Sequence, residues 1–256
     1  MEFIKDKLTV KIFETRDEMG IASAKDISSC IKKMLAEKEE INIIFAAAPS
    51  QSDMLLHLCR EEGIEWSRIN AFHMDEYIGL APDAPQCFSN FLKREIFDLK
   101  PFKSVNLINA GAADANEEAK RYAGLLKENP VDIVLMGIGE NGHIAFNDPH
   151  EALFDDPQAV KAVTLDEVCR MQQVNDGCFA KLDDVPKFAL TLTIPTLMSA
   201  KYNFCVVPAP TKAKAVKRTV FGKISEECPA TALRVKDNAV LYCDKDSSVL
   251  IKDEVK

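Results

Sequence analysis

Short apolar runs alternate with segments of helical periodicity along most of the chain. Apolar residues recur every three or four positions between residues 24 and 35, and Thr15-Arg16-Asp17-Glu18 before them is typical of a capping box. The run INIIFAAA at residues 41–48 is short and continuous, as expected of a strand buried on both faces. The pattern predicts strands at 41–48, 68–74, 105–108, 131–136, 187–193, 203–207 and 239–243, and helices at 15–35, 52–63, 88–97, 115–128 and 211–220.

This order of elements predicts a three-layer α/β fold, with a mostly parallel central sheet and helices on both faces in a Rossmann-like arrangement. The chain has no internal repeat, low-complexity tract or linker, so we expect a single domain over residues 1–256. Residues 147–157 contain two prolines and four acidic residues and are predicted to be irregular and exposed. The composition of residues 147–180 makes them a candidate mobile lid.

Composition and charge narrow the classes of function. The net charge of −8 argues against a nucleic-acid partner and against an anionic membrane surface, because both need a basic footprint. No apolar run reaches the roughly 18 residues that span a membrane, and the first residues lack the apolar stretch of a signal peptide. The eight cysteines are scattered without a CxxC pair, which indicates reduced, mostly buried thiols in a cytoplasmic protein. A local pocket for an anionic metabolite is compatible with this charge.

Three polar segments directly follow predicted strands: residues 49–52, 75–77 and 137–149. In open α/β sheets, ligands bind beyond the carboxyl ends of the strands. We therefore expect these segments to converge in space although they are far apart in the sequence.

The segment Gly137-Ile-Gly-Glu-Asn-Gly-His143 matches the glycine pattern of dinucleotide-binding loops. That pattern requires a helix directly after the glycines, and Pro149 leaves little room for one. We therefore interpret the glycines, Gly139 among them, as places where the backbone turns sharply and approaches a ligand. His143 can move protons near neutral pH, with Asn141 and Asp148 close enough in sequence to orient its ring.

Two further groups of residues suit chemistry on a small anion. Asp75 and Glu76 are adjacent at a strand end, so one can face a pocket as a base while the other caps or pairs nearby. Asp75 is the candidate base, and Glu76 is a candidate substrate-binding residue. Phosphate needs backbone N–H groups and a cation. Residues near two predicted helix starts supply these groups: Ser50, Gln51, Ser52 and Lys212.

The segment from Gly137 to Pro149, GIGENGHIAFNDP, strongly resembles the signature loop of the glucosamine-6-phosphate deaminase/isomerase family, which is related to the 6-phosphogluconolactonase-like fold. Residues 72–80, FHMDEYIGL, resemble the family's second active-site segment, and VPKFALTLT at 185–193 and PTKAKA at 210–215 follow in the expected order. The resemblance covers nearly the whole chain.

The resemblance implies conversion of glucosamine 6-phosphate and water to fructose 6-phosphate and ammonia, without a metal or organic cofactor. It implies that His143 helps to open the sugar ring and that Asp75 moves a proton from C2 to C1. It also implies that Lys212, the 49–52 turn and Arg170 hold the phosphate. Some members are homo-oligomers, so self-association of this chain is a further expectation.

This chain departs from the family pattern at two positions beside His143. The family often has an aspartate where this chain has Asn141 and a glutamate where it has Asp148. Its phosphate turn usually reads TGGTP, whereas this chain has AAAPSQS at residues 46–52. Three alternatives stay open: galactosamine 6-phosphate as substrate, a 6-phosphogluconolactonase-like hydrolase, and a non-catalytic sugar-phosphate sensor.

Overall fold

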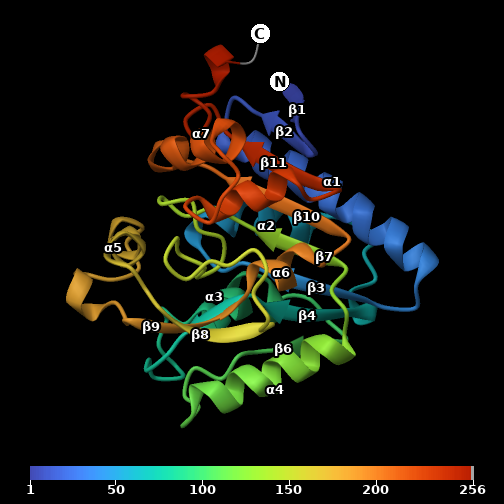
Figure 1. Ribbon diagram of the computed structural model, residues 1–256. Coiled ribbons are helices and arrows are strands. Elements are labelled where there is room, and N and C mark those ends of the chain that lie inside the picture. Colours follow the sequence, from blue (N-terminus) through green and yellow to red (C-terminus); the bar gives the residue numbers. More distant parts are fainter. Residues whose placement is uncertain (255–256) are drawn as a thin grey trace.

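The computed structural model describes residues 1–254 and contains a large sheet and a small one (Figure 1). The large sheet has eight strands in the order β1-β2-β11-β10-β7-β3-β4-β6, and the small sheet has the order β5-β9-β8. The strands are β1 (Glu2–Lys5), β2 (Leu8–Ile12), β3 (Ile41–Phe45), β4 (Ile69–His73), β5 (Asp75–Tyr77), β6 (Ser104–Asn106), β7 (Ile133–Met136), β8 (Val160–Thr164), β9 (Phe188–Leu192), β10 (Tyr202–Val207) and β11 (Ala239–Cys243).

Helices connect most of these strands. The α-helices are α1 (Arg16–Glu37), α2 (Ser52–Arg60), α3 (Phe88–Leu92), α4 (Ala115–Glu128), α5 (Glu167–Asn175), α6 (Ile194–Met198) and α7 (Ala213–Phe221). Short helical turns are η1 (Pro49–Gln51), η2 (Trp66–Arg68), η3 (Lys93–Phe97), η4 (Leu182–Asp184), η5 (Pro210–Lys212), η6 (Pro229–Arg234) and η7 (Lys252–Glu254). Thr15 caps α1 by accepting a hydrogen bond from Glu18 N at 3.1 Å, as the capping box predicts.

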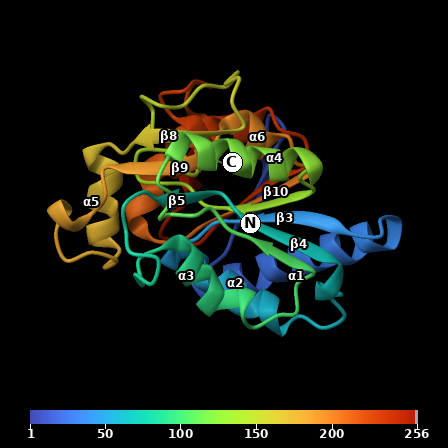
Figure 2. The same cartoon turned by 90° about the horizontal axis from the view of Figure 1, so that it is seen from below.

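The large sheet is parallel except at β1, which pairs antiparallel with β2. Figure 2 shows α1, α2 and α3 on one side of this sheet and α4 and α6 on the other. The apolar residues form two clusters that fit these two sides, with Ile43 of β3 in one cluster and its neighbour Ile44 in the other. This confirms the predicted three-layer, mostly parallel α/β fold. It also explains the continuous apolar run of β3, because both of its faces are buried.

The small antiparallel sheet is the main departure from the prediction. Residues 187–193 were expected to form a strand of the central sheet, but β9 pairs with β5 and β8 instead. The hairpin of β1 and β2, strand β8 and helix α5 were not predicted. Residues 147–157 are irregular as expected, but the prediction that they are exposed is wrong for Asn147 and Asp148, which are fully buried. Their polar side chains are used in internal hydrogen bonds rather than hydrated.

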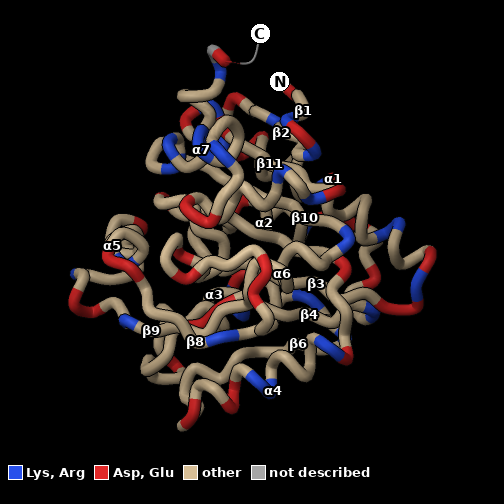
Figure 3. The backbone as a smooth tube through the Cα atoms, viewed as in Figure 1, with Lys and Arg blue, Asp and Glu red and all other residues tan. Residues whose placement is uncertain are grey.

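The surface and the thiols agree with the composition. Figure 3 shows acidic and basic residues interspersed over the helices and loops. All eight cysteines are free thiols, and five of them are buried: Cys87, Cys169, Cys205, Cys228 and Cys243. Within residues 1–254, none of the helices combines the length and the apolar character that a membrane crossing requires.

Candidate active site

One cavity lies at the carboxyl ends of four neighbouring central strands, β10, β7, β3 and β4. It encloses about 490 Å³, including the part that opens to solvent. Residues from all three predicted polar segments line it, so the expected convergence is confirmed. The lining residues are Ala46, Ala47, Ala48, Ser50, Gln51, Met74, Asp75, Phe88, Gly137, Ile138, Gly139, His143, Ala145, Phe146, Gln172, Gln173 and Lys212.

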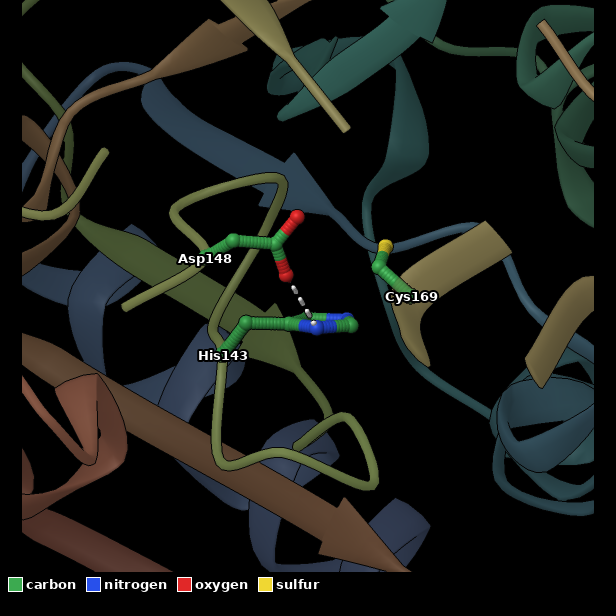
Figure 4. A group of neighbouring side chains, drawn as sticks. All are labelled: His143, Asp148 and Cys169. Atoms are coloured by element: carbon green, nitrogen blue, oxygen red, sulfur yellow. Dashed lines mark ion pairs between the residues drawn. The ribbon is translucent and has the colours of Figure 1, made fainter. Parts of the chain in front are cut away.

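His143 and Asp148 form a buried pair at the wall of this cavity. His143 Nδ1 lies 3.0 Å from Asp148 Oδ1, which leaves Nε2 as the ring nitrogen for a ligand (Figure 4). Burial opposes ionisation of Asp148, but hydrogen bonds from His143, Asn141 and the backbone of Asp166 lower its pKa overall. The aspartate is therefore held as a carboxylate facing the imidazole.

Gly139 lets the imidazole take this position. A Cβ at residue 139 would overlap the His143 ring. The backbone closes the loop on itself, because Gly139 N donates to His143 O at 2.9 Å and Gly142 N donates to Gly139 O at 3.0 Å. Gly142 has a φ of +94°, which a residue with a side chain rarely adopts.

The side chain of Asn141 does not hydrogen-bond to the imidazole ring of His143. Its Nδ2 donates to Asp148 Oδ1 at 2.8 Å and to Asp166 Oδ2 at 3.0 Å, and its Oδ1 accepts from His143 N at 3.0 Å. Asn141 therefore orients the pair through Asp148 and through the backbone.

The thiol of Cys169 lies beside this pair (Figure 4). One ligand atom each of His143, Asp148 and Cys169 lies within 4.8 Å of the other two, a grouping that the scattered cysteines did not predict. Burial raises the pKa of Cys169 well above the usual value for a thiol, so the thiolate that a metal would need is disfavoured. Both oxygens of Asp148 already accept hydrogen bonds from protein donors. We therefore interpret the group as a proton-transfer pair next to a neutral thiol.

Asp75 and Glu76 point to different places, as expected of adjacent strand residues. Asp75 lines the cavity, and burial together with the charge of Glu76 raises its pKa well above the usual range. Glu76 is fully buried and accepts hydrogen bonds from Tyr77 N at 3.0 Å, Phe88 N at 2.9 Å and Ser89 N at 2.8 Å. It therefore caps α3, and the prediction that it contacts substrate is wrong.

Lys212 brings a cation to the cavity. The residue is only 4% exposed, and its Nζ has no hydrogen-bond partner among residues 1–254. Burial lowers its pKa, although Asp176 and Glu140 lie near enough to favour the ammonium form. An unpaired buried ammonium that lines a cavity is suited to an anionic ligand.

Ser50 and Gln51 line the same cavity as this cation. Gln51 Nε2 donates to Ser50 Oγ and to Val206 O, both at 3.1 Å. Because Ser50 Oγ accepts that bond, its own hydrogen is available to a ligand.

Two other predicted binding residues do not reach the cavity. Arg170 Nη2 donates to Leu182 O at 2.7 Å and to Val185 O at 2.9 Å, so its guanidinium ties down the segment after α5. Ser52 is the first residue of α2, and its N donates to Pro49 O. The structure therefore does not support a direct phosphate contact by either residue.

Helix α5 contributes residues that the sequence analysis missed. Gln172 and Gln173 line the cavity, and Gln172 Oε1 accepts from Glu140 N at 2.9 Å. Asp166 caps α5 by accepting from Cys169 N at 2.6 Å. The N-cap pattern of Asp166 before Glu167 was the signal that could have predicted this helix.

Together, the fold and the cavity define an α/β protein with a buried carboxylate, a histidine–aspartate pair and a buried lysine at the carboxyl ends of its central strands. The model of one protein family, described as glucosamine-6-phosphate isomerases/6-phosphogluconolactonase, matches residues 14–242. The chain belongs to this family.

Relatives and solved structures agree with this assignment. A glucosamine-6-phosphate deaminase of Bacillus cereus (strain G9842) is 34% identical over 248 residues, which cover 97% of this chain and 91% of that protein. A solved structure described as a monomeric glucosamine-6-phosphate deaminase has a TM-score of 0.84 and 30% identity, covering 94% of this chain and 99% of its own. A 6-phosphogluconolactonase from Thermotoga maritima has a TM-score of 0.76 and 18% identity, covering 93% and 100%, and shares the fold.

Proposed function

We propose that this protein converts glucosamine 6-phosphate and water to fructose 6-phosphate and ammonia. One observation carries the proposal: Asp75, the His143–Asp148 pair and the unpaired ammonium of Lys212 line or border the same cavity. The relatives at 34% and 30% identity, both described as glucosamine-6-phosphate deaminases, support it.

The phosphate is assigned to the end of the cavity near Lys212. Its negative charge would pair with the ammonium, and Ser50 can donate from its hydroxyl. Gln51 lies at the same wall and Gly139 on the adjoining loop. This placement gives the buried Lys212 Nζ a partner, which residues 1–254 do not provide.

Opening of the sugar ring is assigned to His143. In this step a proton leaves the C1 hydroxyl and a proton is given to the ring oxygen, so a base that becomes an acid is needed. His143 Nε2 can do both, while the Asp148 carboxylate lies 3.0 Å from Nδ1 and orients the ring.

Proton transfer between carbons is assigned to Asp75. The open chain has an aldehyde at C1, which acidifies the C2–H bond, so no cofactor is needed for this step. Asp75 takes the proton from C2 while the C1 oxygen gains a proton, which gives an enol with a double bond between C1 and C2. Asp75 then returns its proton to C1 and the nitrogen loses one, which leaves an imine at C2. Its raised pKa makes it a stronger base than an exposed aspartate. Water then adds to C2, and ammonia leaves.

The test is a paired assay of both products. Purified protein is incubated with glucosamine 6-phosphate, and ammonia and fructose 6-phosphate are measured together. Equal amounts of both are expected. If neither product forms although calorimetry detects binding of glucosamine 6-phosphate, the proposed enzymatic activity is contradicted and a sugar-phosphate sensor is favoured. Galactosamine 6-phosphate and a 6-phosphogluconolactone are assayed in parallel, and turnover of either one alone would redirect the substrate assignment.

Three broader features belong to the same proposal. We propose a single domain in which residues 147–180 act as a lid, supported by the place of α5 in the cavity wall. A cytoplasmic location fits the eight free thiols. Self-association stays a prediction that size-exclusion chromatography with light scattering tests, and the solved relative at 30% identity is described as monomeric.

A further inference from the structure

The side chain of Asn141 lies between two carboxylates. Each hydrogen of its amide has a separate acceptor, because Nδ2 donates to Asp148 Oδ1 at 2.8 Å and to Asp166 Oδ2 at 3.0 Å. Its oxygen accepts from His143 N at 3.0 Å. An amide can make these three bonds at once, whereas an aspartate at this position could accept the third but donate neither of the first two.

Asp166 joins this bridge to helix α5. Its Oδ1 accepts from Cys169 N at 2.6 Å, which caps the helix, and its own N donates to Asp148 Oδ2 at 3.2 Å. Six residues after Asp166, α5 begins its contribution to the cavity wall with Gln172, which accepts from Glu140 N at 2.9 Å. The segment of Asp166 and α5 and the glycine loop are therefore held together at two points, by Asn141 with Asp166 and by Glu140 with Gln172.

We propose that Asp166 is a positioning residue for the reaction, acting through Asn141 to hold Asp148 against His143 while α5 closes the cavity. This inference rests on the proposed function. Asp166 does not line the cavity, so its effect on the substrate is indirect. The hydrogen bonds to Asp148 fix where its carboxylate stands relative to Nδ1, and small displacements of an acid–base group slow a reaction strongly.

The first variant keeps the helix cap and removes the bridge. In Asp166→Ser, the shorter side chain can still cap α5 but cannot reach Asn141. The matched control is Asp114→Ser, because Asp114 caps α4 by accepting from Asn116 N at 2.8 Å, away from the cavity. We expect kcat of Asp166→Ser to fall about 10- to 100-fold with KM changed less than about threefold. Asp114→Ser should change neither parameter.

The second test exchanges the two side chains. Asn141→Asp alone places three carboxylates together, and Asp166→Asn alone removes the acceptor of one amide hydrogen. The double variant Asn141→Asp/Asp166→Asn puts an amide beside a carboxylate again in the reverse order. The exchange restores a hydrogen bond between positions 141 and 166, but Asp148 Oδ1 still lacks the donor that Asn141 provides, so we expect kcat of the double variant to stay at least about tenfold below the wild type. Since both positions stay polar and of equal size, this comparison holds even where Asp166→Ser unfolds.

A readout that does not depend on turnover separates this inference from the proposed function. In ¹⁵N-labelled protein, the two side-chain amide protons of Asn141 should exchange slowly with solvent, and Asp166→Ser should release one of them. Wild-type protein that makes neither product while keeping this protection would overturn the function but not the bridge. Unchanged kcat in Asp166→Ser, a change confined to KM, or fast exchange of both protons in the wild type would overturn the positioning role.

Discussion

Replacing Lys212 by methionine separates two effects of its ammonium group. Methionine keeps a similar length and an apolar stem but has no charge. A hydrogen bond to a charged group contributes about 1.5–3 kcal/mol, and each 1.4 kcal/mol is a factor of ten in affinity. Because the Nζ has no protein partner within the described residues 1–254, this contribution is available to the phosphate alone. We therefore expect Lys212→Met to weaken binding of glucosamine 6-phosphate about 10- to 150-fold.

The same change should stabilise the ligand-free protein. The ammonium is buried and has no partner in the part of the chain that the structure describes, so an apolar side chain of similar volume should raise the free energy of unfolding by about 1–3 kcal/mol. The gain has a defined pH dependence. Burial lowers the pKa of Lys212 in the folded protein, so the unfolded chain binds this proton more strongly. Below the lowered pKa, the buried charge therefore reduces the free energy of unfolding of the wild type by its full amount. The difference in free energy of unfolding between Lys212→Met and the wild type shrinks as the pH rises from that pKa toward 10.5.

Urea unfolding and isothermal calorimetry measure the two effects on the same samples. The control is Lys214→Met, which makes the same chemical change at an exposed position of α7. It should change neither binding nor stability by more than about 0.5 kcal/mol. A Lys212→Met protein that binds glucosamine 6-phosphate as tightly as the wild type would refute the assignment of this lysine to the phosphate. A less stable variant would refute the claim that its charge is unpaired.

Three further changes test the other groups of the site. Asp75→Asn should abolish turnover while calorimetry still detects binding, and measurable turnover by this variant would exclude the proton-transfer role. Burial raises the pKa of Asp75 well above the usual range, so kcat/KM of the wild type should fall as the pH drops through that raised pKa. His143→Gln should lower kcat by about 10²–10⁴-fold, and unchanged rates would make the residue structural. Gly139→Ala should displace the His143 ring and lower kcat about 10²-fold, whereas Gly124→Ala on α4, where a Cβ meets nothing within 4 Å, should leave kcat unchanged.

The parallel part of the fold could be predicted because its strands are buried on both faces. The run of residues 41–48 is apolar except for Asn42, as expected of a strand that lies between two helical layers, and all five residues of β3 are buried. Once the sheet is parallel, its strand ends meet at one edge, and the proximity of His143, Asp75 and Lys212 follows. Strand β8 and helix α5 carry weaker signals, since β8 is half exposed and α5 has mostly polar residues.

The misplaced residues show where sequence reasoning reaches its limit. The family resemblance placed Arg170 at the phosphate, but in this chain its guanidinium is used by the carbonyls of Leu182 and Val185. Nothing local to Arg170 announces those acceptors, because they lie 12 and 15 positions away. Glu76 was misplaced for a different reason, which concerns the pairing of strand β5.

Strand alternation already required Asp75 and Glu76 to point apart, so only one of them could meet the substrate. Which one does so depends on the pairing of β5 with β9, and that pairing joins residues more than a hundred positions apart. Groups at the carboxyl ends of a parallel sheet are thus predictable from the order of the elements. Groups from the antiparallel layer beside it, among them the α5 side chains that complete the cavity, depend on contacts that only the folded chain defines.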